Sequence, residues 1–299
     1  MIDLRFARSD NGRVNMFIDN LEVKVTGRIL KTARLRNEWT DFTTDPKAFI
    51  DKMRQAGVGA ALFTFLQEIH DLEPKHSYHQ DHDSIAVIPV STYDHWWKNQ
   101  IPDKTRNMIR KATKSGVEVR LAPFDDDFVR GVMAIYQESP VRQGRRFWHY
   151  GKDFETNKRE TGTFPERSQF IGAYHEGKIV GFAKLTRNAN SASLMFIISM
   201  MAHRNKAPQN ALIAKAVEIC DAQGIPYLQY GSWSRGGLGD FKIKHGFVRF
   251  DVPRFYVPLN AIGRLALKWT LYRKPVEYLP EKWVETLVDW RAKYYTMKA

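Results

Sequence analysis

The sequence between residues 168 and 233 restricts the possible folds more than any other part of the chain. Residues 168–200, SQFIGAYHEGKIVGFAKLTRNANSASLMFIISM, hold three apolar runs separated by two turns, and they predict three consecutive antiparallel strands. A polar turn follows, residues 209–223 have the apolar spacing of a helix, and residues 225–233 have the pattern of a further strand. Three antiparallel strands, a helix and a parallel strand predict a mixed α/β sheet instead of a Rossmann repeat.

The segments on either side of this region predict more of the same class of fold. The other expected elements are strands at 17–27, 59–69, 83–90, 117–122 and 247–259, helices at 45–57, 125–139 and 237–246, and a loop at 140–167. Asp45 and Pro46 mark the start of the first of these helices. Residues 91–116 predict a helical stretch that Pro102 interrupts.

The balance of charges indicates an anionic partner. The chain has 46 Lys and Arg residues against 33 Asp and Glu residues, which gives a net charge of +13. Basic residues are concentrated in two stretches, 104–120 and 142–159. Such clustering favours binding to RNA, to a phosphorylated carrier or to an anionic membrane surface over a positive charge that only serves solubility.

The single cysteine and the hydropathy pattern suggest a reducing compartment. Cys220 has no second cysteine with which to form an internal disulfide, and it falls in the apolar pattern of a helix. The N-terminal residues MIDLRFARSD lack the apolar region of a secretory signal, and the chain has no run of 18 apolar residues. We therefore expect a soluble cytoplasmic protein.

The turn at 203–208 lies where a helix N-terminus would face an anion. Backbone N–H groups and the helix dipole favour negative charge at such a position. Glycine is the usual residue there because it lets the backbone approach a phosphate, whereas this turn has Ala207, Pro208 and Gln209.

This strand order and turn resemble the GNAT acyltransferases. Their signature R-x-x-G-x-G/A, which holds the diphosphate of coenzyme A, aligns with residues 204–209, RNKAPQ, where Pro208 offers no N–H. The resemblance implies a GNAT-like fold with acyl-CoA as donor cosubstrate. The residues that it implies at the cofactor are Arg204, Lys206, Ala207, Gln209 and Asn210.

Two further stretches resemble the Fem-type branch, the peptidoglycan aminoacyltransferases. Residues 105–120, TRNMIRKATKSGVEVR, are similar to R-x-x-I-R-K-A-x-x-x-G-V-x-V, and residues 239–247, GDFKIKHGF, are similar to F-K-x-x-F-G with His245 in place of the second Phe. Those enzymes have two GNAT-like halves and move an amino acid from aminoacyl-tRNA onto a cell-wall precursor. The resemblance implies a degenerate N-terminal half at 1–100, an acyltransferase half at 101–259 and a helical tail at 260–299.

Acyl transfer to an amine needs alignment, removal of a proton and stabilisation of negative charge. The resemblance implies that Lys242 holds donor phosphate or stabilises that charge, with Phe241 packed beside it. His149 is a candidate general base because its ordinary pKa is near neutral, and Tyr230 is a candidate acid for the leaving group.

Residues 139–152, SPVRQGRRFWHYGK, form the densest group of polar side chains and predict an acceptor or phosphate clamp. The candidate substrate-binding residues of this segment and of the helix at 105–116 are Arg142, Gln143, Arg145, Tyr150, Lys152, Arg106 and Arg110. Residues 79–83, HQDHD, lack a second cluster at metal-ligand spacing, so we interpret them as a polar loop and expect no metal.

The last forty residues predict two amphipathic helices, with stripes formed by Leu265, Trp269 and Tyr272 and by Trp283, Leu287, Trp290 and Tyr294. These stripes fit docking on the protein body or on a second subunit, and also fit peripheral contact with the inner membrane surface.

Three hypotheses follow. The first is an acyl- or aminoacyltransferase that forms an amide on an amine of an anionic cell-envelope precursor, of peptidoglycan or polysaccharide type. The second is an acyl-CoA-dependent N-acetyltransferase for an amino sugar, peptide or small amine. The third is a non-catalytic protein that binds RNA or membranes.

Overall fold

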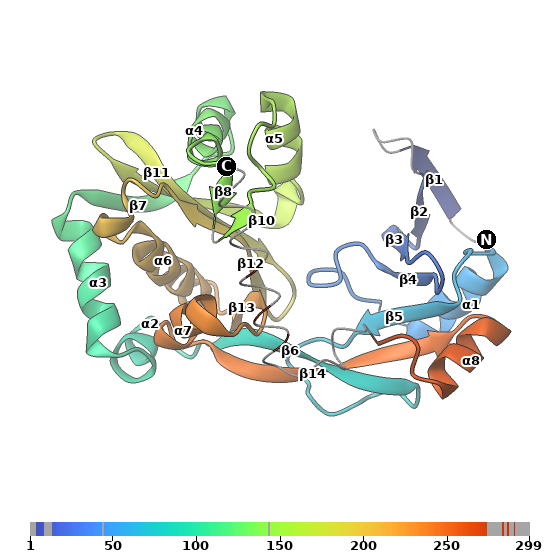
Figure 1. Ribbon diagram of the computed structural model, residues 1–299. Coiled ribbons are helices and arrows are strands. Elements are labelled where there is room, and N and C mark those ends of the chain that lie inside the picture. The colour runs from blue at the N-terminus through green and yellow to red at the C-terminus, as the bar shows by residue number, and fades with distance from the viewer. Residues whose placement is uncertain are drawn as a thin grey trace. The chain divides into compact units, whose positions relative to one another are not determined.

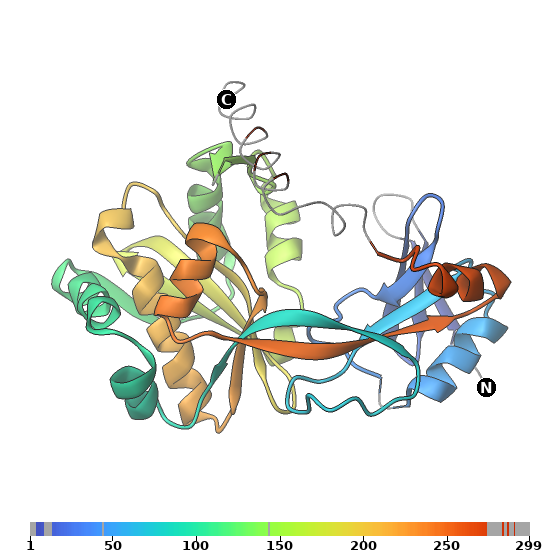
Figure 2. The ribbon, with the colours of Figure 1, turned by 60° about the horizontal axis from the view of Figure 1, so that its bottom comes forward.

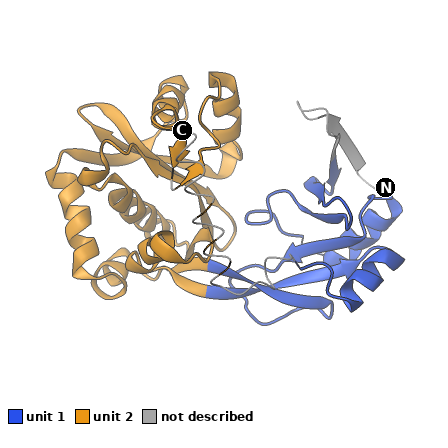
Figure 3. Ribbon diagram, viewed as in Figure 1, with its two compact units in different colours: residues 1–85, 250–278 blue, residues 86–249, 279–299 orange. Residues whose placement is uncertain are grey.

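A computed structural model describes residues 4–8, 14–43, 45–142 and 144–273, together with residues 283, 286 and 290. The chain forms two compact units, which Figure 3 shows in different colours. Unit 1 comprises residues 1–85 and 250–278, and unit 2 comprises residues 86–249 and 279–299. The division into domains at 100 and 259 follows family resemblance and stays a prediction.

Unit 2 contains a mixed sheet with the strand order β6-β13-β12-β11-β10-β7 (Figure 1). Its strands are β7 (Val117–Ala122), β10 (Ser168–His175), β11 (Lys178–Arg187), β12 (Ala192–Ser199), β13 (Tyr227–Ser232) and the second part of β6 (His79–Pro89). β7, β10, β11 and β12 pair antiparallel in turn, whereas β12 and β13 pair parallel. The predicted strands and parallel crossover are therefore confirmed.

Helices cover both faces of this sheet. α6 (Pro208–Ala222) and α3 (Asp103–Lys114) lie on one face, and α4 (Asp126–Gln137) and α5 (Phe154–Thr161) lie on the other, as Figure 2 shows for α6 and α4. Successive side chains of β11 point to opposite faces of the sheet, so each face receives its own set of apolar residues. Ala183 packs in the apolar core of α6, while the ring of its neighbour Phe182 lies 5.9 Å from those of Phe128 and Tyr136 on α4.

Unit 1 repeats the same succession of elements on a smaller scale. Its sheet has the order β1-β2-β3-β4-β5-β14, and α1 lies between the parallel strands β4 and β5. The bounds are β1 (Leu4–Arg8), β2 (Val14–Ile18), β3 (Leu21–Thr26), β4 (Thr32–Leu35), α1 (Pro46–Gln55), β5 (Leu62–Leu66) and β14 (Val248–Pro258). Antiparallel strands, a helix and a parallel strand thus occur twice, as expected of a fold with two GNAT-like halves.

The helix boundaries follow local sequence. Asp45 caps α1 and accepts a hydrogen bond from Ala48 N at 3.0 Å, as predicted. Pro102 separates η1 (Trp96–Gln100), which follows α2 (Tyr93–His95), from α3. α7 (Gly236–Lys244) covers the predicted short helix before β14.

Three predictions about elements were wrong. The single strand expected at 17–27 is the hairpin β2–β3, because Asp19 and Asn20 take positive φ values of 51° and 62° and form its turn. The loop expected at 140–167 contains β8 (Val141–Arg142), β9 (Arg145–Arg146), η2 (Pro165–Arg167) and α5, whose first turn Asp153 caps. The loop expected at 79–83 is the first part of β6.

The C-terminal helices are described only in part. α8 (Ala261–Lys268) ends before Trp269, and Thr270 takes a φ of 54°, so the helix does not continue to Tyr272 as the predicted stripe required. Tyr272 therefore lies beyond the helix, and its ring packs 4.4 Å from that of Tyr256. Of the second stripe, Leu287 and Tyr294 lie outside the described residues. Within the part that the structure describes, no helix is long and apolar enough to cross a membrane.

A buried ionic group lies inside unit 1. Arg254 of β14 is 6% exposed and forms ion pairs with Glu38 at 2.9 Å and Asp83 at 2.7 Å. It also donates to Thr64 Oγ1 at 3.2 Å. Desolvation opposes the charge of Arg254, but the two carboxylates outweigh it and raise its pKa. Arg254 lies opposite Leu66 in the pairing of β14 with β5, so this ionic group adjoins that strand pair.

Candidate functional site

A cavity of about 400 Å³ in unit 2 opens at the N-terminal end of α6. Its lining comes from β12, β13, α7, the first turn of α6 and the turn before it, and consists of Ile197, Arg204, Gln209, Tyr230, Gly237, Leu238 and Phe241. Four of the predicted site residues, Arg204, Gln209, Tyr230 and Phe241, therefore meet at one place. The cavity combines an apolar wall with an amide, a phenol and a guanidinium, the composition of a ligand site.

The divergence of two parallel strands makes room for the cavity. β12 and β13 pair only at Ala192–Leu228 and Ser193–Gln229 in the described sheet. Beyond these pairs the strands separate, and the cavity lies between Ile197 and Tyr230 farther along them.

Lys242 of α7 lies beside this cavity and is 3% exposed. Its Nζ donates to Ser232 O at 2.7 Å and to Ser234 Oγ at 3.1 Å, and lies 4.5 Å from the centre of the Tyr230 ring. Burial lowers the pKa of Lys242 to about 8. None of the carboxylates that the structure describes forms an ion pair with it. Lys242 is thus a cation held by neutral oxygens and an aromatic face.

Tyr230 stays protonated at neutral pH, because burial raises the pKa of its phenol to about 12. Its ring packs 5.8 Å from that of Phe247 and faces the cavity on the side of α7. The arrangement places a proton donor and a cation next to the same volume.

His245, which departs from the Fem-type motif, connects α6 and α7 at the cavity. Its Nε2 lies 3.0 Å from Asn210 Nδ2 of α6, and its Nδ1 lies 2.7 Å from Phe241 O of α7. Nδ1–H donates to the Phe241 carbonyl, so Nε2 accepts from Asn210. Burial lowers the pKa of His245 to about 4, which keeps it neutral. The side-chain amide of Asn210 therefore contacts protein, away from the cavity lining.

The turn before α6 differs from a glycine-rich phosphate cradle. Lys206 N donates to His203 O at 2.9 Å and Ala207 N donates to Arg204 O at 3.1 Å, so the turn uses both amides itself. Pro208 has no N–H. Three successive positions thus offer no backbone donor to a ligand. Ala207 takes a left-handed φ of 56°, the conformation that a signature glycine would adopt without strain.

Arg142 lies between elements of the fold. Its guanidinium donates to Ser199 O at 2.8 Å, to Ile135 O at 2.7 Å and to Glu138 at 2.8 Å. Burial lowers the pKa of Arg142. Glu138 also accepts from Met201 N at 2.6 Å, so the end of α4 is bound to the chain that leaves β12. The guanidinium of Arg142 thus uses its N–H groups to connect the end of α4 to the end of β12.

His149 lies on the opposite face of the sheet from the cavity. Its ring stacks on Tyr136 at 4.4 Å and lies 5.8 Å from Phe196, whereas Ile197, the next residue of β12, lines the cavity. Desolvation and the nearby Lys152 lower the pKa of His149, although Glu160 opposes them. The structure therefore does not bring His149 together with Tyr230 and Phe241.

The other residues of the predicted clamp do not line the cavity either. Lys152 forms an ion pair with Glu160 at 2.7 Å and lies 4.3 Å from the Trp148 ring. Tyr150 is 43% exposed, Arg145 is exposed on β9, and Gln143 lies outside the described residues. Lys152, Tyr150 and Arg145 are therefore separate from the cavity lining.

The two arginines of α3 differ in their contacts. Arg106 donates to the carbonyls of Trp97, Lys98 and Ile101 and to Asp103, so it closes the end of η1. Arg110 is exposed, with its guanidinium 5.3 Å from the Trp97 ring. Only Arg110 presents its charge to solvent.

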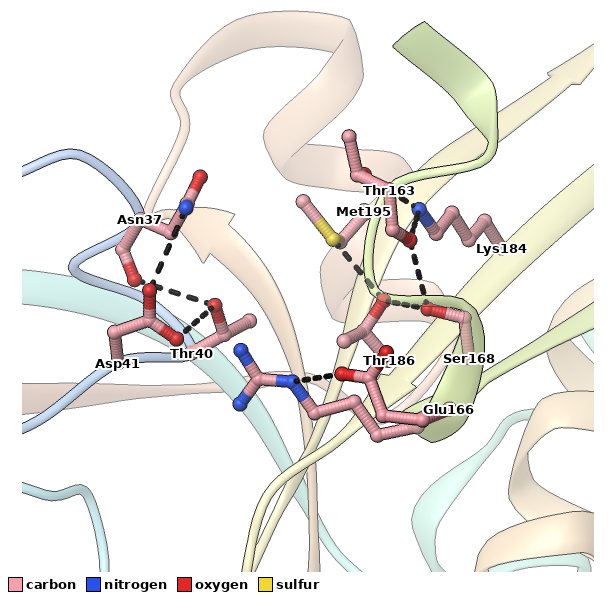
Figure 4. Close-up of polar contacts among 10 residues, drawn as sticks. Asn37, Thr40, Asp41, Thr163, Glu166, Ser168, Lys184, Thr186 and Met195 are labelled. Carbon is pink, nitrogen blue, oxygen red and sulfur yellow. Dashed lines mark hydrogen bonds and ion pairs between the residues drawn. The ribbon is translucent and has the colours of Figure 1, made fainter. Parts of the chain in front are cut away.

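A second buried lysine of unit 2 was not among the predicted site residues. Lys184 of β11 is fully buried, and its Nζ donates to Thr161 O at 2.8 Å, to Thr163 Oγ1 at 2.7 Å and to Thr163 O. Burial lowers the pKa of Lys184 to about 8. Figure 4 shows it beside the hydroxyl pair Ser168–Thr186. The signal was a lysine in the middle of the apolar run KIVGFAKLTR.

Three of the polar residues at 79–83 have side-chain partners within unit 1. His79 Nε2 lies 2.9 Å from Tyr272 Oη, Asp81 pairs with Arg273 at 2.9 Å, and Asp83 pairs with Arg254. Among the described residues, no group of three or more His, Cys, Asp or Glu side chains is arranged to hold a metal ion.

Three solved structures share this fold over most of the chain. The C-terminal domain (DUF2156) of a protein assigned as a lysylphosphatidylglycerol synthetase from Agrobacterium fabrum is 14% identical, with a TM-score of 0.57 over 89% of this chain and 87% of that chain. FemX is 11% identical, with a TM-score of 0.58 over 89% and 90%. L-PGS from Bacillus licheniformis is 14% identical, with a TM-score of 0.56 over 89% and 88%.

No protein-family model and no curated protein sequence matches the chain. At these identities the solved structures establish the architecture, and function has to be argued from the site. The predicted GNAT-like fold is confirmed, and it is the fold of FemX and of the lysylphosphatidylglycerol synthetase domain.

Proposed function

We propose that this protein is a GNAT-like aminoacyltransferase, which moves an aminoacyl group from aminoacyl-tRNA onto an amine of a cell-envelope precursor. The observation that carries the proposal is the cavity at the α6 N-terminus, with Tyr230 and Phe241 in its lining and the buried cation Lys242 beside it. A buried cation with no carboxylate partner among the described residues costs stability, and such residues concentrate at functional sites.

The reaction is an aminolysis of an ester. The acceptor amine attacks the ester carbonyl, a C–N bond forms, the C–O bond to the terminal ribose breaks, and the amine loses a proton. Lys242 stabilises the negative charge that develops on the departing oxygen. Tyr230, a phenol at neutral pH, gives that oxygen a proton and recovers one from the amine through solvent. Phe241 supplies an apolar wall that excludes water.

The choice of donor follows from the turn before α6. A coenzyme A diphosphate needs several backbone donors, and residues 206–208 offer none because the turn uses two amides and Pro208 has none. Arg204 and Gln209 in the cavity lining still supply side-chain donors for a single phosphate or a ribose. An aminoacyl ester of a nucleic acid end fits this set better than acyl-CoA.

The acceptor class rests on two supports. The net charge of +13 favours an anionic molecule. One structural neighbour bears a name that refers to lysylphosphatidylglycerol, and this name supports an acceptor at the cell envelope without specifying the group that is acylated.

The test compares the transfer rates from two donors, and the effects of replacing two lysines of α7. Purified protein is incubated with labelled aminoacyl-tRNA or labelled acetyl-CoA, with cell-envelope precursors that carry a free amine. We expect transfer from aminoacyl-tRNA, a loss of at least about 100-fold in rate in Lys242→Met, and near wild-type rate in Lys244→Met, whose lysine is exposed on the same helix.

Circular dichroism verifies that both variants are folded. Transfer from acetyl-CoA alone would replace this proposal with the acyl-CoA-dependent enzyme. Full activity of a folded Lys242→Met variant would contradict the role of that residue.

A further inference from the structure

The orientation of α8 on unit 1 is fixed by two small residues. A Cβ atom at Gly263 would lie 2.0 Å from Ala61 O, so the helix backbone touches the chain beneath it. Ala266, one turn later, is 2% exposed. Asn260 caps the helix and accepts from Gly263 N at 3.0 Å. The opposite side of α8 therefore faces solvent in a defined orientation.

That side carries large apolar residues. Ile262, Leu265 and Trp269 are 65%, 55% and 65% exposed, at spacings i, i+3 and i+7. Ile29, in the loop between β3 and β4, is 100% exposed. Ile29 and Ile262 border one hollow of about 410 Å³, so the loop and the helix contribute to the same surface.

The two segments that carry these apolar residues contribute charges of one sign. Arg28, Lys31, Arg264 and Lys268 are exposed, and none forms an ion pair with a residue that the structure describes. Residues 27–31 and 260–273 contain no Asp or Glu. The apolar side chains thus lie among unneutralised cations.

We propose that this surface, formed by Ile29, Ile262, Leu265 and Trp269 with its four cations, binds the face of an anionic lipid bilayer. Apolar residues that protrude from a basic surface enter the boundary between headgroups and acyl chains, while Lys and Arg pair with lipid phosphates. A second copy of the chain is the weaker occupant, because a symmetric contact would bring like charges together. The inference is independent of the transfer reaction.

The test measures the binding of the full-length protein to vesicles by flotation. Wild-type protein binds vesicles that contain phosphatidylglycerol, binds phosphatidylcholine vesicles at least about tenfold more weakly, and loses affinity as salt rises. The double variant Ile29→Ser/Trp269→Ser binds anionic vesicles at least about tenfold more weakly. Leu72→Ser, which changes an apolar residue of unit 1 that is 41% exposed, binds as wild type does.

Two charge-reversal variants distinguish attraction of the vesicle to this surface from attraction to the net charge of the protein. Lys268→Glu and Lys47→Glu change the net charge equally, but only the former acts at the proposed surface. We expect Lys268→Glu to weaken binding about tenfold and Lys47→Glu to have little effect. Equal weakening by both, wild-type binding by Ile29→Ser/Trp269→Ser, or a wild-type dimer that the double variant makes monomeric would each overturn the proposal.

Discussion

Burial lowers the pKa of two lysines of unit 2, Lys184 and Lys242. Each has a pKa of about 8 in the folded chain, well below the ordinary value near 10.5 that it would have in the unfolded chain. Between these values the unfolded chain binds more protons, so stability rises with pH in this window, while below about pH 8 the full penalty of the buried charge is present.

The first prediction concerns Lys184. The stability of the wild type relative to Lys184→Met should rise between about pH 8 and pH 10.5, because only the wild type sheds this buried charge. Urea unfolding at several pH values measures the difference. Lys178→Met, which changes an exposed lysine of the same strand, should show no such trend. A pH-independent difference for Lys184→Met would show that Lys184 titrates normally.

Ala207 carries a second prediction at this scale, because its left-handed φ of 56° is costly for any residue with a Cβ atom. Ala207→Gly should stabilise the chain by about 1 kcal/mol in urea unfolding. Ala222→Gly, at the end of the same helix, should destabilise by a similar amount. A less stable Ala207→Gly variant would mean that the methyl group contributes more by packing than its conformation costs.

At the scale of elements, His245 determines how α6 and α7 meet. His245→Phe restores the residue of the Fem-type motif, but it leaves the Asn210 amide and the Phe241 carbonyl without their partner. We expect a loss of about 2 kcal/mol at pH 7.

The pH dependence of that loss is the check. The folded pKa of His245 is about 4 and its ordinary value is 6.5, so the wild type loses stability as pH falls through this range while the variant does not lose this part. The gap between them in urea unfolding should narrow from pH 6.5 to pH 4. A constant gap would contradict a neutral, buried His245.

Sequence patterns predicted most elements of unit 2 because its strands and helices carry long periodic apolar runs. Sequence signals of only one or two residues were not enough to predict the elements that they mark. Asp19-Asn20 forms a hairpin turn within an apparently continuous strand, and α5 is so polar that only its cap, Asp153, marked it. The loop prediction at 79–83 failed because partners far away in the sequence, Arg254 and Arg273, neutralise the charges of Asp83 and Asp81.

The candidate site could be predicted only for residues that lie in or near the stretches resembling family motifs, at 204–209 and 239–247. Arg204, Gln209, Tyr230 and Phe241 do meet at one cavity. His149 could not be assigned to a face from sequence, because that depends on which side of β12 its loop packs. Composition also could not show that Arg106 would use its donors on the carbonyls of η1.

At the scale of the molecule, unit 1 depends on one buried ionic group. Arg254→Met leaves Glu38 and Asp83 without their cation and should cost about 3–5 kcal/mol. Arg34 pairs with the same Glu38 at 3.5 Å but is 42% exposed, so Arg34→Met should cost less than about 1 kcal/mol. Thermal and urea unfolding measure both, and equal costs would contradict a special role for Arg254.

β6 and β14 each run without a break from one unit into the other, and this has a consequence for dividing the gene. A fragment of residues 1–85 would lack residues 254–258, which pair with β5. All five residues of β5 are buried, so the fragment would expose an apolar edge strand and aggregate. Unit 1 can be produced alone only if a designed linker joins residue 85 to residue 250, because its own two segments are separated by the whole of residues 86–249.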